Sequence, residues 1–130
     1  MPNLEEEARK FMQDKLMITE VITPDLYEKL AGETAIFPKE KALEYLALGL
    51  TSEAGEVAGK VKKLIRDGED KEGFELKKIA ISHEIGDVLW YCAMMAKEVG
   101  VSLNTIMAEN LEKLHSRKER GTLHGSGDNR

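Results

Sequence analysis

The sequence contains few of the residues that build disulfide frameworks, β-sheets or membrane spans. Cys92 is the single cysteine among 130 residues, so no intrachain disulfide can form, and a reducing compartment is expected. Aromatic residues make up only 5% of the chain, and Ala, Leu, Met, Glu and Lys predominate, which favours helices over a sheet. The longest uncharged stretch in the apolar half, residues 88–96, is too short to cross a bilayer. These absences indicate an all-α protein of the cytoplasm.

Positive charge is outnumbered, because 19 Lys and Arg stand against 24 Asp and Glu and the net charge is -5. The field of the whole molecule therefore repels nucleic acid and anionic membranes, and we expect neither as a partner. The N-terminal residues carry the run Glu5-Glu6-Glu7 and no basic segment followed by an apolar one, which excludes a secretory signal. Any binding of phosphate must depend on a local group of cations.

The length and the 42% content of apolar residues fit one domain, which we place at residues 1–120, followed by a flexible, glycine-rich tail at residues 121–130. Apolar residues recur at helical spacing, and capping or turn residues interrupt the pattern. The segment around residue 90 is apolar on several faces and should be the central helix. The pattern predicts a compact bundle of four to five helices, over residues 3–22, 25–30, 39–66, 74–99 and 103–117, with a loop at residues 69–73.

Two pairs of carboxylates stand on helix faces that should turn toward the core. Glu53 continues an apolar stripe, and Glu56 follows one turn later. Glu84 and Asp87 repeat this spacing inside the most apolar helix. Burying like charges is costly unless a cation or strong partners neutralise them. Antiparallel helices can bring such pairs to one patch, and oxygen ligands without histidine or thiolate select Mg²⁺ or Mn²⁺ over zinc, so we predict a metal site of these four side chains.

Side chains that suit phosphate accompany these acids in the helical pattern. The first of these side chains along the sequence is Lys60, which lies one turn beyond Glu56. The last predicted helix carries Asn110, Lys113 and Arg117 at steps of three and four residues. A metal flanked by Lys, Asn and Arg suits a polyphosphate substrate, whose charge the metal and the cations share. For Lys113 and Arg117 the alternative is ordinary solvated charge near a helix C-terminus.

The segments around the acids resemble the two motif helices of the MazG-like, all-α nucleoside triphosphate pyrophosphohydrolases. The first segment is Leu-Thr-Ser-Glu-Ala-Gly-Glu at residues 50–56, and the second is Glu-Ile-Gly-Asp-Val-Leu-Trp-Tyr at residues 84–91. The later Asn110-x-x-Lys113 resembles a nucleotide-contacting element of the same family. The resemblance runs from about residue 39 to residue 113.

The resemblance implies a helical bundle, assembled as a homodimer or homotetramer, that uses Mg²⁺ to cleave a nucleoside or deoxynucleoside triphosphate to monophosphate and pyrophosphate. It also implies a role for each matching residue. The implied metal ligands are Glu53, Glu56, Glu84 and Asp87, the nucleotide contacts are Tyr91 and Asn110, and the phosphate contacts are Lys60, Lys113 and Arg117. The tail of residues 117–130 resembles that of small phage and bacterial MazG-like proteins, and we expect it to close over the phosphates or over a neighbouring subunit.

The expected reaction uses the metal to lower the pKa of a bound water, while a carboxylate not fully committed to the metal accepts the proton. Glu53 or Glu56 is the expected base, and the sequence leaves the choice between them open. It also leaves open the number of metal ions and whether water attacks the α or the β phosphorus.

Substrate preference depends on the aromatic residues near the acids. Tyr91 lies one turn beyond Asp87, so we expect it to contact the sugar or base, whereas its neighbour Trp90 points to another side and is expected in the core. No further aromatic or amide cluster for reading a pyrimidine edge is visible, nor the tryptophan-rich N-terminal pocket of some dCTP-selective members. We therefore slightly favour a purine nucleotide, such as dGTP or GTP, over broad specificity.

Two other hypotheses also place acids inside helices. A carboxylate-bridged di-metal oxidase requires Glu-x-x-His pairs, which are absent, since His83 directly precedes Glu84 and points about 100° away around the helix. A non-enzymatic helical oligomerisation or interaction module needs only salt bridges between the acids and Lys60, Lys62 or Lys63. Spacing alone does not exclude such pairs.

Overall fold

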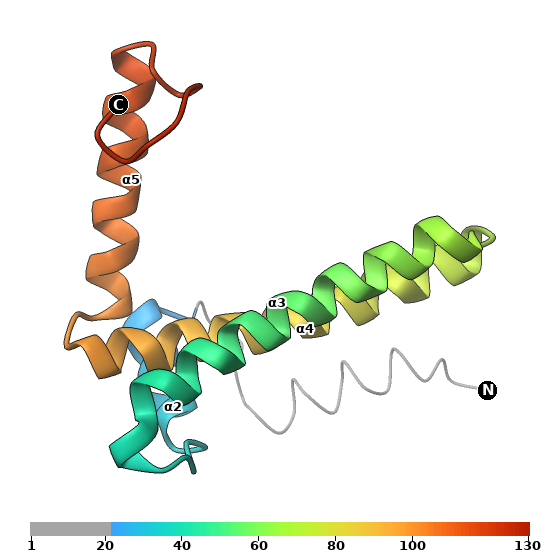
Figure 1. Ribbon diagram of the computed structural model, residues 1–130, viewed down its shortest axis with the longest axis horizontal. Coiled ribbons are helices and arrows are strands. Elements are labelled where there is room, and N and C mark those ends of the chain that lie inside the picture. The colour runs from blue at the N-terminus through green and yellow to red at the C-terminus, as the bar shows by residue number, and fades with distance from the viewer. Residues whose placement is uncertain (1–21) are drawn as a thin grey trace.

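The computed structural model describes residues 22–130, and within this range it contains helices and no strand (Figure 1). The order along the chain is α2 (Pro24–Gly32), the short 3₁₀-helix η1 (Lys39–Lys41), α3 (Ala42–Asp67), α4 (Lys71–Val99) and α5 (Leu103–Glu119). The prediction of an all-α fold is confirmed. The helix expected over residues 3–22 lies almost wholly outside the described residues. Among the described helices, none combines the length and the apolar character needed to span a membrane.

Capping side chains begin α2 and α5 close to where the sequence predicts these two helices to start. The hydroxyl of Thr23 accepts a hydrogen bond from the backbone N–H of Leu26 at 3.2 Å, and α2 starts with proline at the next position. The hydroxyl of Ser102 accepts one from the N–H of Thr105 at 3.1 Å and begins α5. These caps supply partners for N–H groups that the helices themselves leave unpaired.

The connection between the two long helices is shorter than the loop expected at residues 69–73. The Asp70 carboxylate accepts a hydrogen bond from the N–H of Gly73 at 2.8 Å, and α4 therefore begins at Lys71. At the other end of α4, Gly100 adopts a left-handed conformation with φ 75° and ends the helix as expected.

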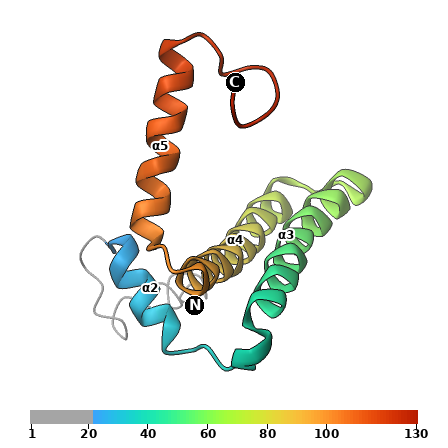
Figure 2. The ribbon, with the colours of Figure 1, turned by 60° about the vertical axis from the view of Figure 1, so that its left-hand side comes forward.

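The helices α3 and α4 lie side by side as a long antiparallel hairpin (Figures 1 and 2). Helix α2 packs against α4 at the end far from the hairpin turn, and α5 leaves this same end and stands away from the hairpin. The N–H of Leu103 donates a hydrogen bond to Oε2 of Glu28 at 3.1 Å, which ties the beginning of α5 to α2. Helix α4 contacts each of the other described α-helices, as expected of the central helix.

The hydrophobic core lies where α2, the beginning of α3 and the last turns of α4 meet. Its buried members are Ala31, Leu46, Ala93 and Met94. Away from this region large apolar side chains stay exposed in the single chain. Ile65 on α3 is 81% exposed and Leu111 on α5 is 65% exposed. Apolar faces of this kind are typical of surfaces that another protein chain covers.

The tail at residues 121–130 forms no helix, but it folds back over the end of α5. The guanidinium of Arg117 donates hydrogen bonds to the carbonyl oxygens of Asp128 at 2.9 Å and Gly127 at 3.4 Å. Arg130 donates to the carbonyl oxygens of Gly127 at 2.6 Å and Thr122 at 3.3 Å. Arg120 also donates a hydrogen bond to the carbonyl oxygen of Arg130 at 3.0 Å. The segment expected to be a flexible tail is thus a closed loop held by three arginines, and it leaves Arg117 only 5% exposed.

Candidate metal centre

Three of the four predicted metal ligands converge across the hairpin. Glu53 on α3 meets Glu84 and Asp87 on α4, and one carboxylate oxygen of each lies within 4.8 Å of the others. The helices are antiparallel, and Glu53 and Glu84 lie at nearly equal distances along the chain from the hairpin turn, so the fold brings them level. Glu53 and Glu84 are partly buried, and Asp87 is exposed.

Glu56 is placed differently from the other three acids. Along α3 it lies one turn nearer the hairpin turn than Glu53, whereas Asp87 on α4 lies one turn farther from it than Glu84. The two pairs are therefore staggered in opposite directions, and the exposed Glu56 carboxylate is not among the converging oxygens. The four-carboxylate cluster expected from spacing is, in the structure, a cluster of three with Glu56 at its edge.

The pKa of Glu53 reflects its lost contact with solvent and the crowding of negative charge around it. Loss of solvent around its carboxyl raises the pKa above the ordinary value of 4.5, and the neighbouring Asp87, Glu84 and Glu56 raise it further. A bound cation relieves this repulsion. Among the described residues no histidine or cysteine joins the group, and carboxylate oxygens alone fit Mg²⁺ or Mn²⁺. His83 is exposed, as its position on α4 predicts.

Lys60 lies at the edge of the carboxylate cluster. Its Nζ is 3.0 Å from Oε1 of Glu84, and the two side chains are 31% and 18% exposed. This ion pair joins α3 to α4 and neutralises one of the three converging acids. Lys60, the predicted phosphate contact, thus lies next to the cluster, with its ammonium paired to one of the acids.

A cavity of about 360 Å³ opens beside the acids, lined by Thr34, Glu53, Asp87, Trp90 and Tyr91. Tyr91, the predicted nucleotide contact, is one of the residues that line it. Trp90 was expected to point elsewhere into the core, but its ring stands edge-on to that of Tyr91, with centroids 4.9 Å apart, and it lines the cavity while also packing against the core. The Trp90 indole N–H donates a hydrogen bond to the hydroxyl of Thr34 at 2.8 Å.

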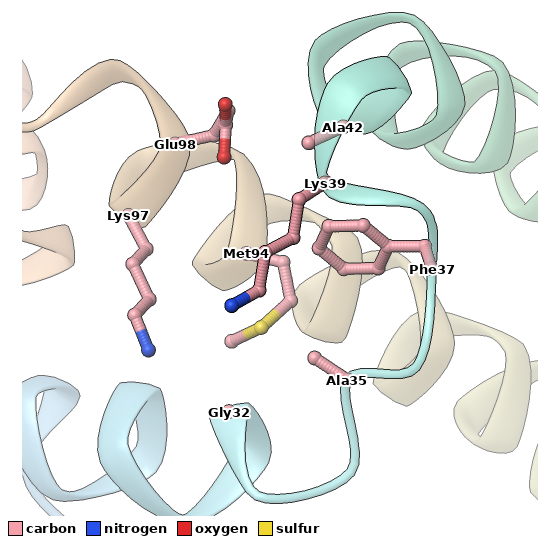
Figure 3. A pocket seen from close by; sticks show the side chains of 8 residues that line it. All are labelled: Gly32, Ala35, Phe37, Lys39, Ala42, Met94, Lys97 and Glu98. Carbon is pink, nitrogen blue, oxygen red and sulfur yellow. The ribbon is translucent and has the colours of Figure 1, made fainter.

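A second cavity, of about 390 Å³, lies between the end of α2, the beginning of α3 and the end of α4 (Figure 3). Figure 3 shows the side chains of Lys39 and Lys97 beside Met94, with the ring of Phe37 at one wall. Sequence reasoning identified none of these residues, because they come from three segments that no periodic pattern connects. The cavity lies next to the first one, since Ala35 follows Thr34 along the chain.

The three predicted contacts on α5 do not reach the carboxylates of their own chain. Helix α5 stands away from the hairpin (Figures 1 and 2), and Asn110 and Lys113 are exposed on it. Arg117 is buried by the closed tail, and its Nη2 group donates hydrogen bonds to the carbonyl oxygens of Gly127 and Asp128. The buried Nε of Arg117 has no partner among the described residues. In the structure Arg117 therefore holds the tail.

Comparisons with known proteins identify the family of the chain. Residues 41–122, which include α3, α4 and α5, match the family described as the MazG nucleotide pyrophosphohydrolase domain. The Gene 37 protein of Mycobacterium phage L5 is 44% identical over 114 residues, which cover 82% of this chain and 97% of the phage protein. No solved structure matches the chain. The protein belongs to the MazG nucleotide pyrophosphohydrolase family.

Proposed function

We propose that the protein is a divalent-metal-dependent nucleoside triphosphate pyrophosphohydrolase, which converts an NTP or dNTP and water to the monophosphate and pyrophosphate. The observation that carries the proposal is the convergence of the Glu53, Glu84 and Asp87 oxygens within 4.8 Å of one another across two helices. Like charges at this separation favour a cation between them, and membership of the MazG family supplies the reaction class.

Glu53, Glu84 and Asp87 would hold Mg²⁺, with Mn²⁺ as a substitute. When bound, the ion would offset the negative charge of the triphosphate and would lower the pKa of a coordinated water. Glu56 is the base that we favour over Glu53, because its carboxylate stands at the edge of the cluster and stays available for a proton. Water oxygen attacks phosphorus at the α–β linkage, its proton passes to Glu56, and the bond to the departing phosphate oxygen breaks.

In this proposal Lys60 pairs with Glu84 and also binds the phosphate groups of the substrate. In the structure its ammonium pairs with Glu84 at 3.0 Å. With a divalent cation held at the cluster, Glu84 would no longer need the Lys60 ammonium for neutralisation, and Lys60 would be free to turn toward the phosphate groups. Because the side chain is partly exposed, this movement requires little rearrangement of the core.

The proposed assembly is a homodimer or homotetramer in which α5 of one subunit completes the site of another. Asn110 and Lys113 stand on a helix that leads away from the acids of their own chain, and the exposed Leu111 follows Asn110 directly. The hairpin also exposes apolar side chains such as Ile65. Covering these faces with a second copy removes apolar surface from water and brings donors to a site that is otherwise strongly acidic.

For the substrate, we propose that the protein slightly prefers a purine nucleotide. Trp90, Tyr91 and Thr34 beside the acids give a cavity wall that suits a sugar and base. The experiment is a panel of the common NTPs and dNTPs with Mg²⁺, in which pyrophosphate and monophosphate are both detected. Rates for dCTP or dUTP more than about tenfold above dGTP and dATP, roughly 1.4 kcal/mol of transition-state discrimination, would reject the purine preference. Release of no pyrophosphate from any member of the panel would reject the function.

A further inference from the structure

Four aromatic side chains form a connected wall along the candidate site. The rings of Phe37 and Tyr45 stack with centroids 5.4 Å apart. Tyr45 is also a neighbour of Tyr91, since burial and then the nearby Tyr45 raise the pKa of the Tyr91 hydroxyl. Tyr91 in turn meets the edge of Trp90 at 4.9 Å, and the Trp90 indole is fixed by its hydrogen bond to Thr34. The wall thus runs from the cavity in Figure 3, which Phe37 lines, to the cavity beside the acids, which Trp90 and Tyr91 line.

The Tyr91 ring lies directly on the backbone of α3 at Gly49. A Cβ atom built on Gly49 would come within 2.7 Å of Cδ1 of Tyr91 and would overlap Cε1 and Cζ of the same ring. Only glycine therefore permits this approach. The other two glycines of α3 differ, because a Cβ at Gly55 or Gly59 meets nothing within 4 Å.

A glycine at position 49 makes α3 less stable than an alanine would, and the place of Gly49 beside the Tyr91 ring explains why a glycine stands there. Glycine inside a helix is less favourable than alanine, and Gly49 stands well inside the 26 residues of α3. It lies one turn before Glu53, so the ring that it admits also lies beside the carboxylate cluster. With a side chain at position 49 the Tyr91 ring could not keep its present place, and the cavity of about 360 Å³ that it borders is open space beside it.

We propose that Gly49 is a positioning residue, whose missing side chain holds the Tyr91 ring against α3 and so keeps the nucleotide cavity open and correctly shaped. This inference rests on the proposed function. Tyr91 is the group that contacts the nucleotide, and Gly49 acts through it.

The kinetic test compares Gly49→Ala with Gly59→Ala, a matched change in the same helix with open space around it. Gly49→Ala should raise KM for the preferred nucleotide about tenfold or more and change kcat much less, because the ring enters the cavity while the acids keep their places. Gly59→Ala should leave KM within about twofold and raise the melting temperature, since alanine is the better helix former. Equal KM values in both variants would overturn the proposal.

A double-mutant cycle shows whether Gly49 acts through Tyr91. Tyr91→Ala removes the ring, so adding Gly49→Ala to it should change KM no further and should raise the melting temperature rather than lower it. The same rise in KM from Gly49→Ala with and without the Tyr91 ring would overturn the proposal, because the glycine would then act by another route.

Fluorescence gives a readout that does not depend on catalysis. Trp90 is the single tryptophan of the sequence, and its ring is 4.9 Å from that of Tyr91. Gly49→Ala should shift the emission of Trp90, and Gly59→Ala should not. If the wild-type protein hydrolyses no nucleotide, the proposed function fails, and the Trp90 emission together with Trp90-monitored binding of dGTP decides this inference separately. Unchanged emission and unchanged dGTP affinity in Gly49→Ala would overturn it.

Discussion

The Nζ of Lys60 on α3 and Oε1 of Glu84 on α4 lie 3.0 Å apart, so an ammonium of the protein stands at the edge of a cluster of converging acids. Both side chains keep contact with solvent, at 31% and 18% exposure, and such a pair contributes at most about 1 kcal/mol to folding after solvent screening. Its value for stability is therefore small. Its position next to the proposed metal ligands is what gives the pair functional meaning.

The first prediction follows from this pair. Lys60→Gln should lower kcat/KM for a triphosphate about tenfold or more, since it removes a cation from the phosphate site, and should change the free energy of unfolding by less than about 1 kcal/mol. Lys62→Gln is the matched control, because it removes the same charge from a lysine that forms no ion pair among the described residues. Equal losses of kcat/KM in the two variants would indicate a general effect of net charge and would contradict the assignment.

The second prediction separates the metal ligands from the base. Mg²⁺ at about 100 times its Kd should stabilise the wild-type protein by about 2.7 kcal/mol, and Glu53→Gln, Glu84→Gln or Asp87→Asn should remove most of this gain. Glu56→Gln should keep most of the gain in melting temperature but lose about 10²-fold to 10⁴-fold in kcat, as expected for loss of a general base. A Glu56→Gln variant that loses the Mg²⁺ response as fully as Glu53→Gln would make Glu56 a ligand.

The third prediction concerns pH in the absence of metal. The pKa of Glu53 is raised above 4.5 by loss of solvent and by the neighbouring acids, so the folded state holds this proton more tightly than the unfolded state. The contribution of Glu53 to stability is fully present below pH 4.5 and is lost as the pH rises through the raised pKa. The melting temperature of the wild-type protein relative to Glu53→Gln should therefore fall as the pH rises from 4 toward neutrality. A difference that is constant over this range would show that Glu53 is not crowded.

The fourth prediction tests whether α5 acts on another subunit. Neither Glu53→Gln nor Lys113→Ala homo-oligomers should have substantial activity. After the two proteins are mixed and allowed to exchange subunits, about a quarter of the sites of a statistical dimer population should combine an intact Glu53 with an intact Lys113 from the other chain. Activity should therefore return to about a quarter of the wild-type value. If exchange is demonstrated and no activity returns, Lys113 does not serve a site in another subunit.

The paired acids could be predicted from the sequence because they lie inside periodic helices. Four-residue and three-residue steps fix which face Glu53 and Glu84 occupy, and two long helices joined by a short connection must be antiparallel. The stagger of Glu56 away from the cluster depends on where the hairpin turns. Since Asp70 caps α4 earlier than the expected loop allows, that register was not visible in the pattern.

The rest of the site arises from contacts between segments distant in sequence. Trp90 lines the cavity because the hydroxyl of Thr34, in the connection after α2, accepts a hydrogen bond from its indole N–H. The need for a glycine at position 49 comes from the ring of Tyr91, which lies 42 positions later in the chain, and no periodicity connects the two residues. Arg117 fits a phosphate-binding pattern on one helix, yet the returning tail supplies its partners.

The most direct test of the account follows the products of dGTP by ³¹P NMR, with Mg²⁺ and with EDTA, for the wild-type protein and for Asp87→Asn. The wild-type protein with Mg²⁺ should yield dGMP and pyrophosphate, and neither EDTA-treated protein nor Asp87→Asn should turn over substantially. A Mg²⁺-dependent wild-type reaction that yields diphosphate and orthophosphate, or full activity in Asp87→Asn, would contradict the central claim that these converging carboxylates catalyse pyrophosphate release.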